Sequence, residues 1–360
     1  MEMAVRYVKL RKPWGSLPQD NARGSILMLV LWSLSLLAAF AVILGFQVRQ
    51  KAMLIKRLDE RSRTHFIAVA GVKKAIAELR KWQLGEPKYA ALNESWSNNP
   101  ASFKNINIGG GIVNICYERI NKQASQQESY YGLTDEESKI GVNSINDTNK
   151  AAMIEVLGRL FMAVLDYNQV QAQDLAACIV DWRDSDNDSP ISFAGAENAY
   201  YEGLAFPYKA RNAALEIPEE LLLIKGMDQD IYNKIKNYVT IYGGGRVNIN
   251  TASEVVLLAL GLSESLVNNI VAFRAGNDGV GGTEDDNVFD SASGILQKIN
   301  EYAHLSESEI TQLSTIISQY LGVKSDNFSA GCEVRLSNSR NISRINCIMN
   351  RNGKILYWQE

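Results

Sequence analysis

ARGSILMLVLWSLSLLAAFAVILGFQVRQ, residues 22–50, is the most informative segment of the chain for its fold. Residues 25–46 carry no charged side chain. At about 1.5 Å per residue, a helix of this length crosses the roughly 30 Å hydrocarbon core of a bilayer. A secretory signal has a shorter apolar region, of about 7–15 residues, and its small-residue cleavage site follows that region. Here Gly24 and Ser25 precede the apolar run, so the order differs from that of a secretory signal peptide.

Charge is distributed unevenly along the chain. The first 24 residues have five Lys or Arg side chains against Glu2 and Asp20, a net charge of +3, and the remainder has a net charge of −6. A basic segment before a single span predicts a cytoplasmic amino terminus, so the residues after Phe46 are expected to be exported. An acidic exported part disfavours DNA or another bulk polyanion as the partner.

Helical periodicity continues beyond the apolar run. Leu58, Val69, Val72, Ile76 and Leu79 recur at helical spacings with Lys and Arg between them. We therefore expect one helix from about residue 25 to about residue 82, ended by the Gly-Glu-Pro sequence at residues 85–87.

Strands are expected on both sides of a helical block. INIGGGIVNICYERI, residues 106–120, is typical of a strand pair interrupted by Gly, and residues 328–360 predict further strands with a turn at Asn352-Gly353. The helices expected between them cover residues 148–168, 170–181, 218–225, 229–238, 253–260, 264–275 and 306–319.

The predicted fold class is α+β, with a long amino-terminal helix and a small antiparallel sheet that receives a large all-α insertion. Residues 47–131 hold the rest of the helix and the first strands. Residues 132–325 form the inserted helical domain, and residues 326–360 form the last strands.

Together these features resemble the type IV pilin-like superfamily, and within it the minor pseudopilin K family of type II secretion systems. Three stretches carry the likeness beyond the amino terminus: DEESKIGVNSIN (135–146), DWRDSDNDSPISFAGAENAYY (181–201) and GGGRVNINTASEVVLLAL (243–260). The resemblance implies a type IV pilin-like fold, a prepilin leader at residues 1–24 removed between Gly24 and Ser25, and a transmembrane segment at residues 25–46.

The resemblance also implies a location and a role. The protein would be a single-pass protein of the bacterial inner membrane with a periplasmic globular domain. It would start the pseudopilus, occupy its tip and support export of folded proteins across the outer membrane. Its partners would be the minor pseudopilins I, J and H.

The fifth residue of the mature chain agrees with a tip position. Most members of the superfamily have Glu there, and this chain has Leu29, a departure that it shares with the K subunits. In a fibre, that Glu can neutralise the terminal amine of the subunit above, whereas an unpaired carboxylate in the membrane costs roughly 2.5–3.5 kcal/mol. A subunit with nothing above it meets no such amine, so an apolar residue is favoured. The alternative is that Leu29 is one more residue of an ordinary signal anchor.

Two acidic loops are candidates for metal binding. In the first, alternate Asp residues copy the opening of an EF-hand, but Ser189 and Gly195 replace the Gly and the bidentate Glu that an EF-hand requires. Crowded carboxylates repel each other, and Ca²⁺ suits flexible oxygen sites better than Mg²⁺. The resemblance also implies calcium here, and the alternative is a solvated acidic loop. The candidate ligands are Asp181, Asp184, Asp186, Asp188 and Glu197.

The second acidic loop is GNDGVGGTEDDNVFD, residues 276–290. Its Gly residues permit the positive φ angles that turn carbonyls toward a common centre. The alternative is a flexible exposed loop. The candidate ligands are Asp278, Glu284, Asp285, Asp286 and Asp290.

A rival function comes from residues 247–276, which also resemble the helix-hairpin-helix elements of exported DNA-uptake proteins. A DNA-binding hairpin presents the amides of a glycine turn to phosphate, beside Lys or Arg. Here the turn at residues 260–263 lacks a Gly-x-Gly pattern, and Glu254 and Glu264 flank it. We therefore expect this hairpin to pack as structure, with no nucleic acid as partner.

An enzymatic function is not expected. The chain has only two His residues, which leaves few members for a Ser/His/Asp or zinc-hydrolase site. Its Gly-rich segments precede strands instead of helices, unlike a phosphate-binding loop. No small-molecule substrate is expected either.

The four cysteines could be oxidised in an exported chain. Cys332 and Cys347 lie on two expected neighbouring strands, a spacing that permits a disulfide. Cys116 and Cys178 have no obvious local partner. The absence of a CxxC pair argues against zinc or thioredoxin-like chemistry.

Overall fold

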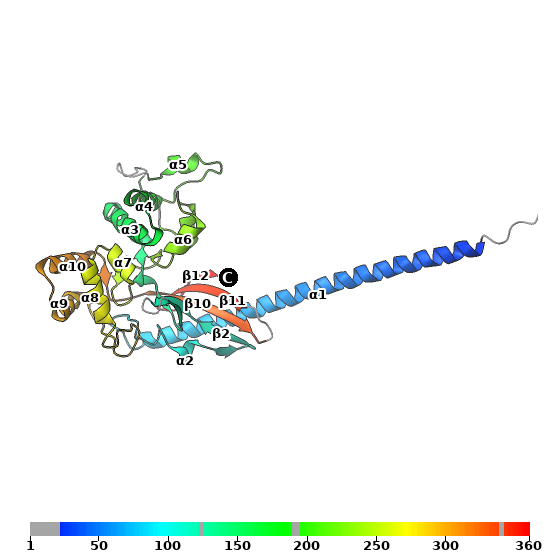
Figure 1. Ribbon diagram of the computed structural model, residues 1–360, viewed down its shortest axis with the longest axis horizontal. Coiled ribbons are helices and arrows are strands. Elements are labelled where there is room, and N and C mark those ends of the chain that lie inside the picture. Colours follow the sequence, from blue (N-terminus) through cyan, green and yellow to red (C-terminus); the bar gives the residue numbers. More distant parts are fainter. Residues whose placement is uncertain (1–21, 122–125, 187, 189–194, 338–341) are drawn as a thin grey trace, which may run out of the picture. The chain divides into compact units, whose positions relative to one another are not determined.

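The computed structural model describes residues 22–121, 126–186, 188, 195–337 and 342–360. The chain falls into two compact units, residues 1–62 and 63–360. Helix α1 (Ala22–Gln83) is continuous, as the periodicity predicted (Figure 1). The helix ends where Gly85 and Glu86 follow, and Glu86 has a φ of 49°, outside the helical region.

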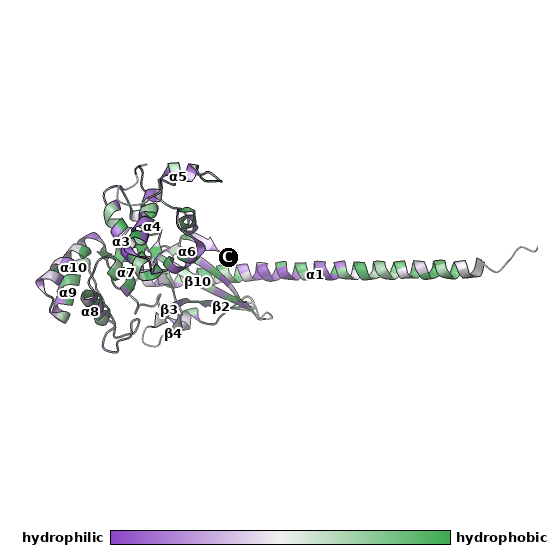
Figure 2. Cartoon of the chain, turned by 45° about the horizontal axis from the view of Figure 1, so that its top comes forward, coloured by the Kyte–Doolittle hydropathy of each residue, from purple (hydrophilic) through white to green (hydrophobic). Residues whose placement is uncertain are grey.

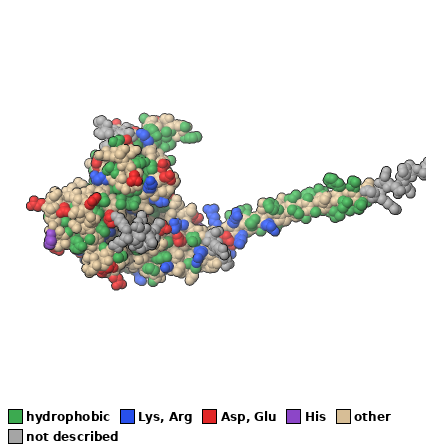
Figure 3. All heavy atoms as spheres, viewed as in Figure 1, with side chains coloured by type: hydrophobic (Ala, Val, Ile, Leu, Met, Phe, Trp, Pro, Cys, Tyr) green, Lys and Arg blue, Asp and Glu red, His purple; other side chains and the backbone are tan. Residues whose placement is uncertain are grey.

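The first unit consists, within the described residues, of the amino-terminal part of α1. Its apolar side chains are exposed, including Leu29 (71%) and Trp32 (74%). Figure 2 shows the amino-terminal end of α1 as mostly hydrophobic and the later residues as hydrophilic, and in Figure 3 Lys and Arg side chains lie on that later part. The helix is long and apolar enough to cross a membrane, and its apolar window is exposed among the described residues. It therefore fits a single-pass membrane anchor.

Strands from distant parts of the sequence form one antiparallel sheet in the order β1-β2-β10-β11-β12, with β5 paired to β10. Gly109 and Gly110 adopt positive φ between β1 and β2, and Gly353 does so between β11 and β12. Both predicted hairpins are confirmed. The strands are β1 (Ile106–Ile108), β2 (Gly111–Ile115), β5 (Thr134–Asp135), β10 (Asn327–Leu336), β11 (Ile342–Asn350) and β12 (Ile355–Gln359). A separate hairpin pairs β3 (Tyr117–Asn121) with β4 (Gln126–Tyr130).

One face of the sheet packs against the part of α1 that belongs to the second unit. Val72 and Leu79 of the helix share a buried core with Val113, Phe328 and other strand residues. At Gly71 a Cβ atom would lie 2.8 Å from the Val113 side chain, so only Gly allows this close approach.

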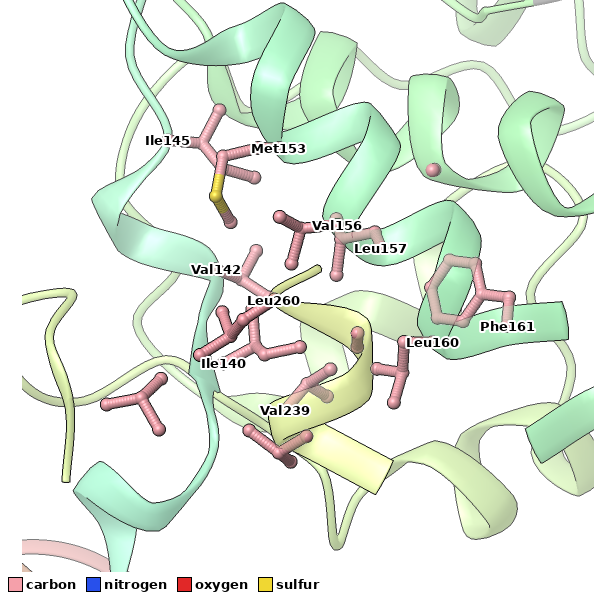
Figure 4. Packing of buried hydrophobic residues seen from close by; sticks show 14 of the residues in the cluster. Ile140, Val142, Ile145, Met153, Val156, Leu157, Leu160, Phe161, Val239 and Leu260 are labelled. Atoms are coloured by element: carbon pink, nitrogen blue, oxygen red, sulfur yellow. The ribbon is translucent and has the colours of Figure 1, made fainter. Parts of the chain in front are cut away.

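A second hydrophobic core lies in the helical block. In Figure 4, labelled side chains of α3, among them Met153 and Val156, gather with Val142 and Leu260. Every expected helix is present, although residues 218–223 form a 3₁₀ helix. The elements are α3 (Lys150–Leu165), α4 (Gln169–Arg183), α5 (Asn198–Glu202), η3 (Pro218–Leu223), α6 (Gln229–Ile235), α7 (Glu254–Ala259), α8 (Glu264–Arg274), α9 (Ile295–Ala303) and α10 (Glu307–Gln319).

The block differs from the expected all-α domain in detail. Helices α5 and α9 were not expected, and α2 (Pro100–Phe103) precedes the sheet. Two short pairs of parallel strands also form between segments that connect the helices, because the fold brings these extended segments together. They are β6 (Ile140–Gly141) with β7 (Val239–Thr240), and β8 (Val247–Asn248) with β9 (Leu321–Gly322).

Candidate functional site

The first acidic loop forms a compact carboxylate group where α4 ends. Asp184 caps α4, donating its backbone N–H to the Val180 carbonyl at 2.8 Å, and only 1% of the residue is exposed. Carboxylate oxygens of Asp147, Asp184 and Asp186 lie within 4.8 Å of one another. Asp147 precedes α3 and was not a predicted ligand. No sequence pattern pointed to Asp147, because it lies far from the acidic loop in the sequence. Only the packing of α3 on α4 brings its carboxylate near Asp184 and Asp186.

Lys150, the first residue of α3, is the cation that faces this group. Its Nζ donates to Asp186 Oδ2 at 2.6 Å and to Asp184 Oδ2 at 3.1 Å. The hydrogen bond to Asp186 is the main cause that raises the pKa of Lys150, and it lowers the pKa of Asp186. Burial nevertheless raises the pKa of Asp184 to about 6, because loss of solvation outweighs the attraction of Lys150.

Glu197, just before α5, is also part of this charged region. It is 8% exposed, and burial followed by repulsion from Asp181, Asp184 and Asp186 raises its pKa to about 7. Within the described part of the chain, neither carboxylate oxygen of Glu197 has a hydrogen-bond partner, and Oδ1 of Asp184 has none either. Burying carboxylate oxygens without donors is unfavourable.

The sequence-predicted ligands of the first loop therefore differ in how close they lie to one another. Asp184 and Asp186 come together, Glu197 and the buried Asp181 lie close enough to interact electrostatically, and Asp188 stands apart as an exposed side chain. The backbone N–H of Asp188 donates to Asp186 Oδ1 at 3.0 Å. The buried oxygens of Asp184 and Glu197, which have no donor among the described residues, are of the type that a hard divalent cation such as Ca²⁺ prefers.

The second acidic loop does not form such a group. Asp285 Oδ2 accepts hydrogen bonds from the backbone N–H groups of Asn277 and Asp278, and both Asp286 oxygens accept from residues 282–283. Asp278 accepts from the Val280 N–H, Asp290 pairs with Lys298 at 3.2 Å, and Glu284 is exposed. The expected convergence is wrong, because these carboxylates fold their own loop. Throughout residues 276–290, all of them described, no three acidic side chains share a centre.

The helix-hairpin-helix element is covered by other helices. In its turn, the N–H of Gly261 donates to Leu258 and that of Leu262 to Leu257. The Gly261 carbonyl accepts from Gln312 of α10, and Arg159 of α3 donates to the Ala259 carbonyl at 2.8 Å. The amides that would face a phosphate are already used, which supports the structural role expected for this hairpin.

Two of the sequence motifs meet in a buried polar junction. Asp135 Oδ2 accepts hydrogen bonds from Asn248 Nδ2 (2.9 Å), Thr251 Oγ1 (2.5 Å) and Ser325 Oγ (2.6 Å), and Oδ1 accepts from the Glu137 N–H (2.8 Å). Glu137 in turn accepts from the backbone and side chain of Asn327 in β10. The junction connects the sheet to the helical block, and no local sequence pattern predicted it.

The spacing of Cys332 and Cys347 permits a disulfide, but the structure does not contain one between them. The structure leaves Cys332 and Cys347 free. In the β10–β11 register, Cys332 lies opposite Ile345 and Cys347 opposite Ala330, so the two thiols are diagonal neighbours. Such neighbours are about 7–8 Å apart, beyond the usual Cα separation of a disulfide. Burial raises the pKa of both thiols to about 12.

The proposed processing site lies at the start of α1. Gly24 and Ser25 fall in its first turn and Leu29 follows in its second, with Ser25 and Leu29 exposed. Residues 1–21 of the expected leader lie outside the described residues.

Comparison with known proteins places these features in one family. The family model for "Type II secretion system (T2SS), protein K" matches residues 138–244. The type II secretion system protein K of Pectobacterium carotovorum subsp. carotovorum is 24% identical over 245 residues, which are 66% of this chain and 68% of that protein. Protein K of Aeromonas hydrophila is 27% identical over 172 residues, 46% of this chain and about half (48%) of that protein.

These matches show that the chain is similar to the type II secretion system protein K family. The stretch matched by the family model contains α3, α4 and the carboxylate group around Asp184. The fold is also shared with a chain of the GspK-GspI-GspJ complex of the enterotoxigenic Escherichia coli type 2 secretion system. The TM-score is 0.62 at 18% identity, covering 84% of this chain and 98% of that one. The α+β fold class expected for a K-family protein is thus confirmed.

Proposed function

We propose that this protein is a minor pseudopilin at the tip of a type II secretion pseudopilus, where it starts assembly and supports export of folded proteins across the outer membrane. The role is one of assembly and not of catalysis. The observation that carries the proposal is the pairing of an exposed apolar helix with a globular domain of K-family fold. The basic leader favours a cytoplasmic amino terminus and a periplasmic domain.

The tip position follows from the absence of a carboxylate at Leu29. A subunit inside the fibre needs that carboxylate to meet the amine of the subunit above. Leu29 is apolar and exposed on α1, which suits contact with lipid or with neighbouring apolar helices.

The proposed partners are the minor pseudopilins I, J and H. The structurally similar chain comes from a GspK-GspI-GspJ complex, which supports I and J. The apolar part of α1 is the element through which such helices would pack.

A secretion assay tests this function. A bacterium that lacks the gene should retain its secreted proteins in the periplasm, and the wild-type gene should restore their release. The full chain in detergent should also co-purify with I and J, whereas a single-pass anchor of unrelated sequence should not. Normal secretion by the deletion strain would contradict the proposal.

We also propose that calcium binds the group formed by Asp147, Asp184, Asp186 and Glu197. The support is the grouping of the Asp147, Asp184 and Asp186 carboxylates, together with the buried oxygens of Asp184 and Glu197 that have no donor among the described residues. Calcium would supply the positive charge that offsets their mutual repulsion and would fix the loop after α4 against α3.

Calcium binding is tested by thermal unfolding of the full chain in detergent. At a calcium concentration of 100 times Kd, the folded state gains about 2.7 kcal/mol. The melting temperature should therefore be higher in calcium than in chelator, and Mg²⁺ should raise it less than calcium does. Asp147→Asn and Asp184→Asn should weaken this response. Asp290→Asn, in the second acidic loop, is the matched control and should not. Identical melting curves with calcium and with chelator would contradict the site.

A further inference from the structure

Lys150 forms ion pairs with two of the acidic side chains that the proposed calcium site uses. Its Nζ lies 3.1 Å from a carboxylate oxygen of Asp184 and 2.6 Å from one of Asp186, two of the three acids in the compact group. The side chain of Lys150 is partly exposed, whereas that of Asp184 is fully buried. The ammonium group can therefore move into water, and the Asp184 carboxylate cannot.

We propose that Lys150 is an intramolecular competitor of calcium. In the metal-free protein its ammonium neutralises Asp184 and Asp186, and calcium binds by displacing it. This inference rests on the calcium site proposed above and adds the residue that sets the affinity of that site.

A calcium ion bound to the Asp184 and Asp186 carboxylates would compete with the Lys150 ammonium for the same two side chains. Calcium contacts its oxygen ligands at about 2.3–2.6 Å. An ammonium within hydrogen-bond distance of the same oxygens would then lie beside a divalent cation in a partly buried site, where like charges repel strongly. A lysine has a long flexible stem, so its head group can leave without moving α3.

The lysine alone leaves the group incompletely neutralised. It contributes one positive charge, while Oδ1 of Asp184 and both oxygens of Glu197 have no donor in the part of the chain that the structure describes. A divalent cation satisfies these oxygens better, so displacement is favourable at sufficient calcium. At low calcium, Lys150 keeps the domain from carrying several buried charges without any counterion.

The test is calcium titration of the full chain in detergent by isothermal calorimetry, after chelator treatment, together with melting temperatures in chelator. Lys150→Gln removes the charge and keeps a good helix former at the start of α3. It should bind calcium at least about tenfold more tightly than wild type, and it should melt at a lower temperature in chelator.

Two control variants accompany Lys150→Gln. Lys150→Arg keeps the charge and should bind calcium within about threefold of wild type. Lys298→Gln makes the same change in net charge at the lysine paired with Asp290 and should match wild type in both measurements.

The outcomes separate this inference from the proposals on which it rests. Tighter binding confined to Lys150→Gln, with the lower melting temperature in chelator, supports it. Equal or weaker binding by Lys150→Gln overturns it and leaves the calcium site in place. If none of the proteins binds calcium, both the site and the competition are wrong, and the secretion assay still tests the pseudopilin role.

Discussion

Replacing Asp135 with Ala removes the carboxylate on which the buried junction converges. Its two oxygens accept four hydrogen bonds, from Glu137, Asn248, Thr251 and Ser325. Asn248 keeps other acceptors, the Ala90 carbonyl at 2.9 Å and Ser325 Oγ at 2.8 Å, so not every donor is left without a partner.

The cost of the substitution follows from these contacts. Each buried donor that loses its acceptor costs about 1–3 kcal/mol, and two or three donors are affected. Burial raises the pKa of Asp135, because the charged carboxylate loses its solvation inside the protein. Removing the carboxylate also removes this unfavourable desolvation, which offsets part of the loss in stability. We therefore expect a loss of about 3–5 kcal/mol, which lowers the melting temperature by roughly 10 °C in a unit of this size.

Thermal unfolding of the full chain in detergent, followed by tryptophan fluorescence, measures this loss. Asp135→Asn keeps the shape but turns one acceptor into a donor, so it should cost less than Asp135→Ala. Asp326→Ala is the matched control, because Asp326 is 67% exposed and pairs with Arg351 at the surface, a pair worth at most about 1 kcal/mol. If Asp135→Ala lowered stability no more than Asp326→Ala does, the junction would not hold the sheet to the helical block.

Three further predictions concern amino-terminal processing, the apolar residue at position 29 and the titration of Glu137. Prepilin peptidase should yield a chain that starts at Ser25, and Gly24→Leu should remain uncut; amino-terminal sequencing that began after residue 46 would contradict this. Leu29→Glu should reduce secretion, because the carboxylate costs roughly 2.5–3.5 kcal/mol in the bilayer, while Leu29→Met should not; secretion at the wild-type level would refute the tip argument. Burial, then Asp135, raises the pKa of Glu137 to about 8, so stability falls as pH rises from about 4.5 to 8, and Glu137→Gln should flatten that slope in melting experiments; equal slopes would show that Glu137 does not titrate there.

Only part of the candidate site could be predicted from local sequence. Asp184 and Asp186 were found because they are neighbours in an acidic loop, and neighbours stay close in any fold. Asp147 and Lys150 were missed, because their proximity to that loop depends on how α3 packs against α4. In the second loop, composition was misleading, since the same Asp residues that suggested a metal accept hydrogen bonds from their own backbone instead.

The sequence by itself determined the elements whose signals are local. An uncharged run followed by periodic apolar residues specifies α1, and Gly residues in the turns specify the hairpins, because helix formation and turn conformation depend on residues near in the chain. Tertiary structure alone decided the rest. The β10–β11 register set Cys332 and Cys347 diagonally, and the fold placed Asp135 against Asn248 and Ser325. Those pairings join residues far apart in sequence, and only the packing of the two cores decides which side chains meet.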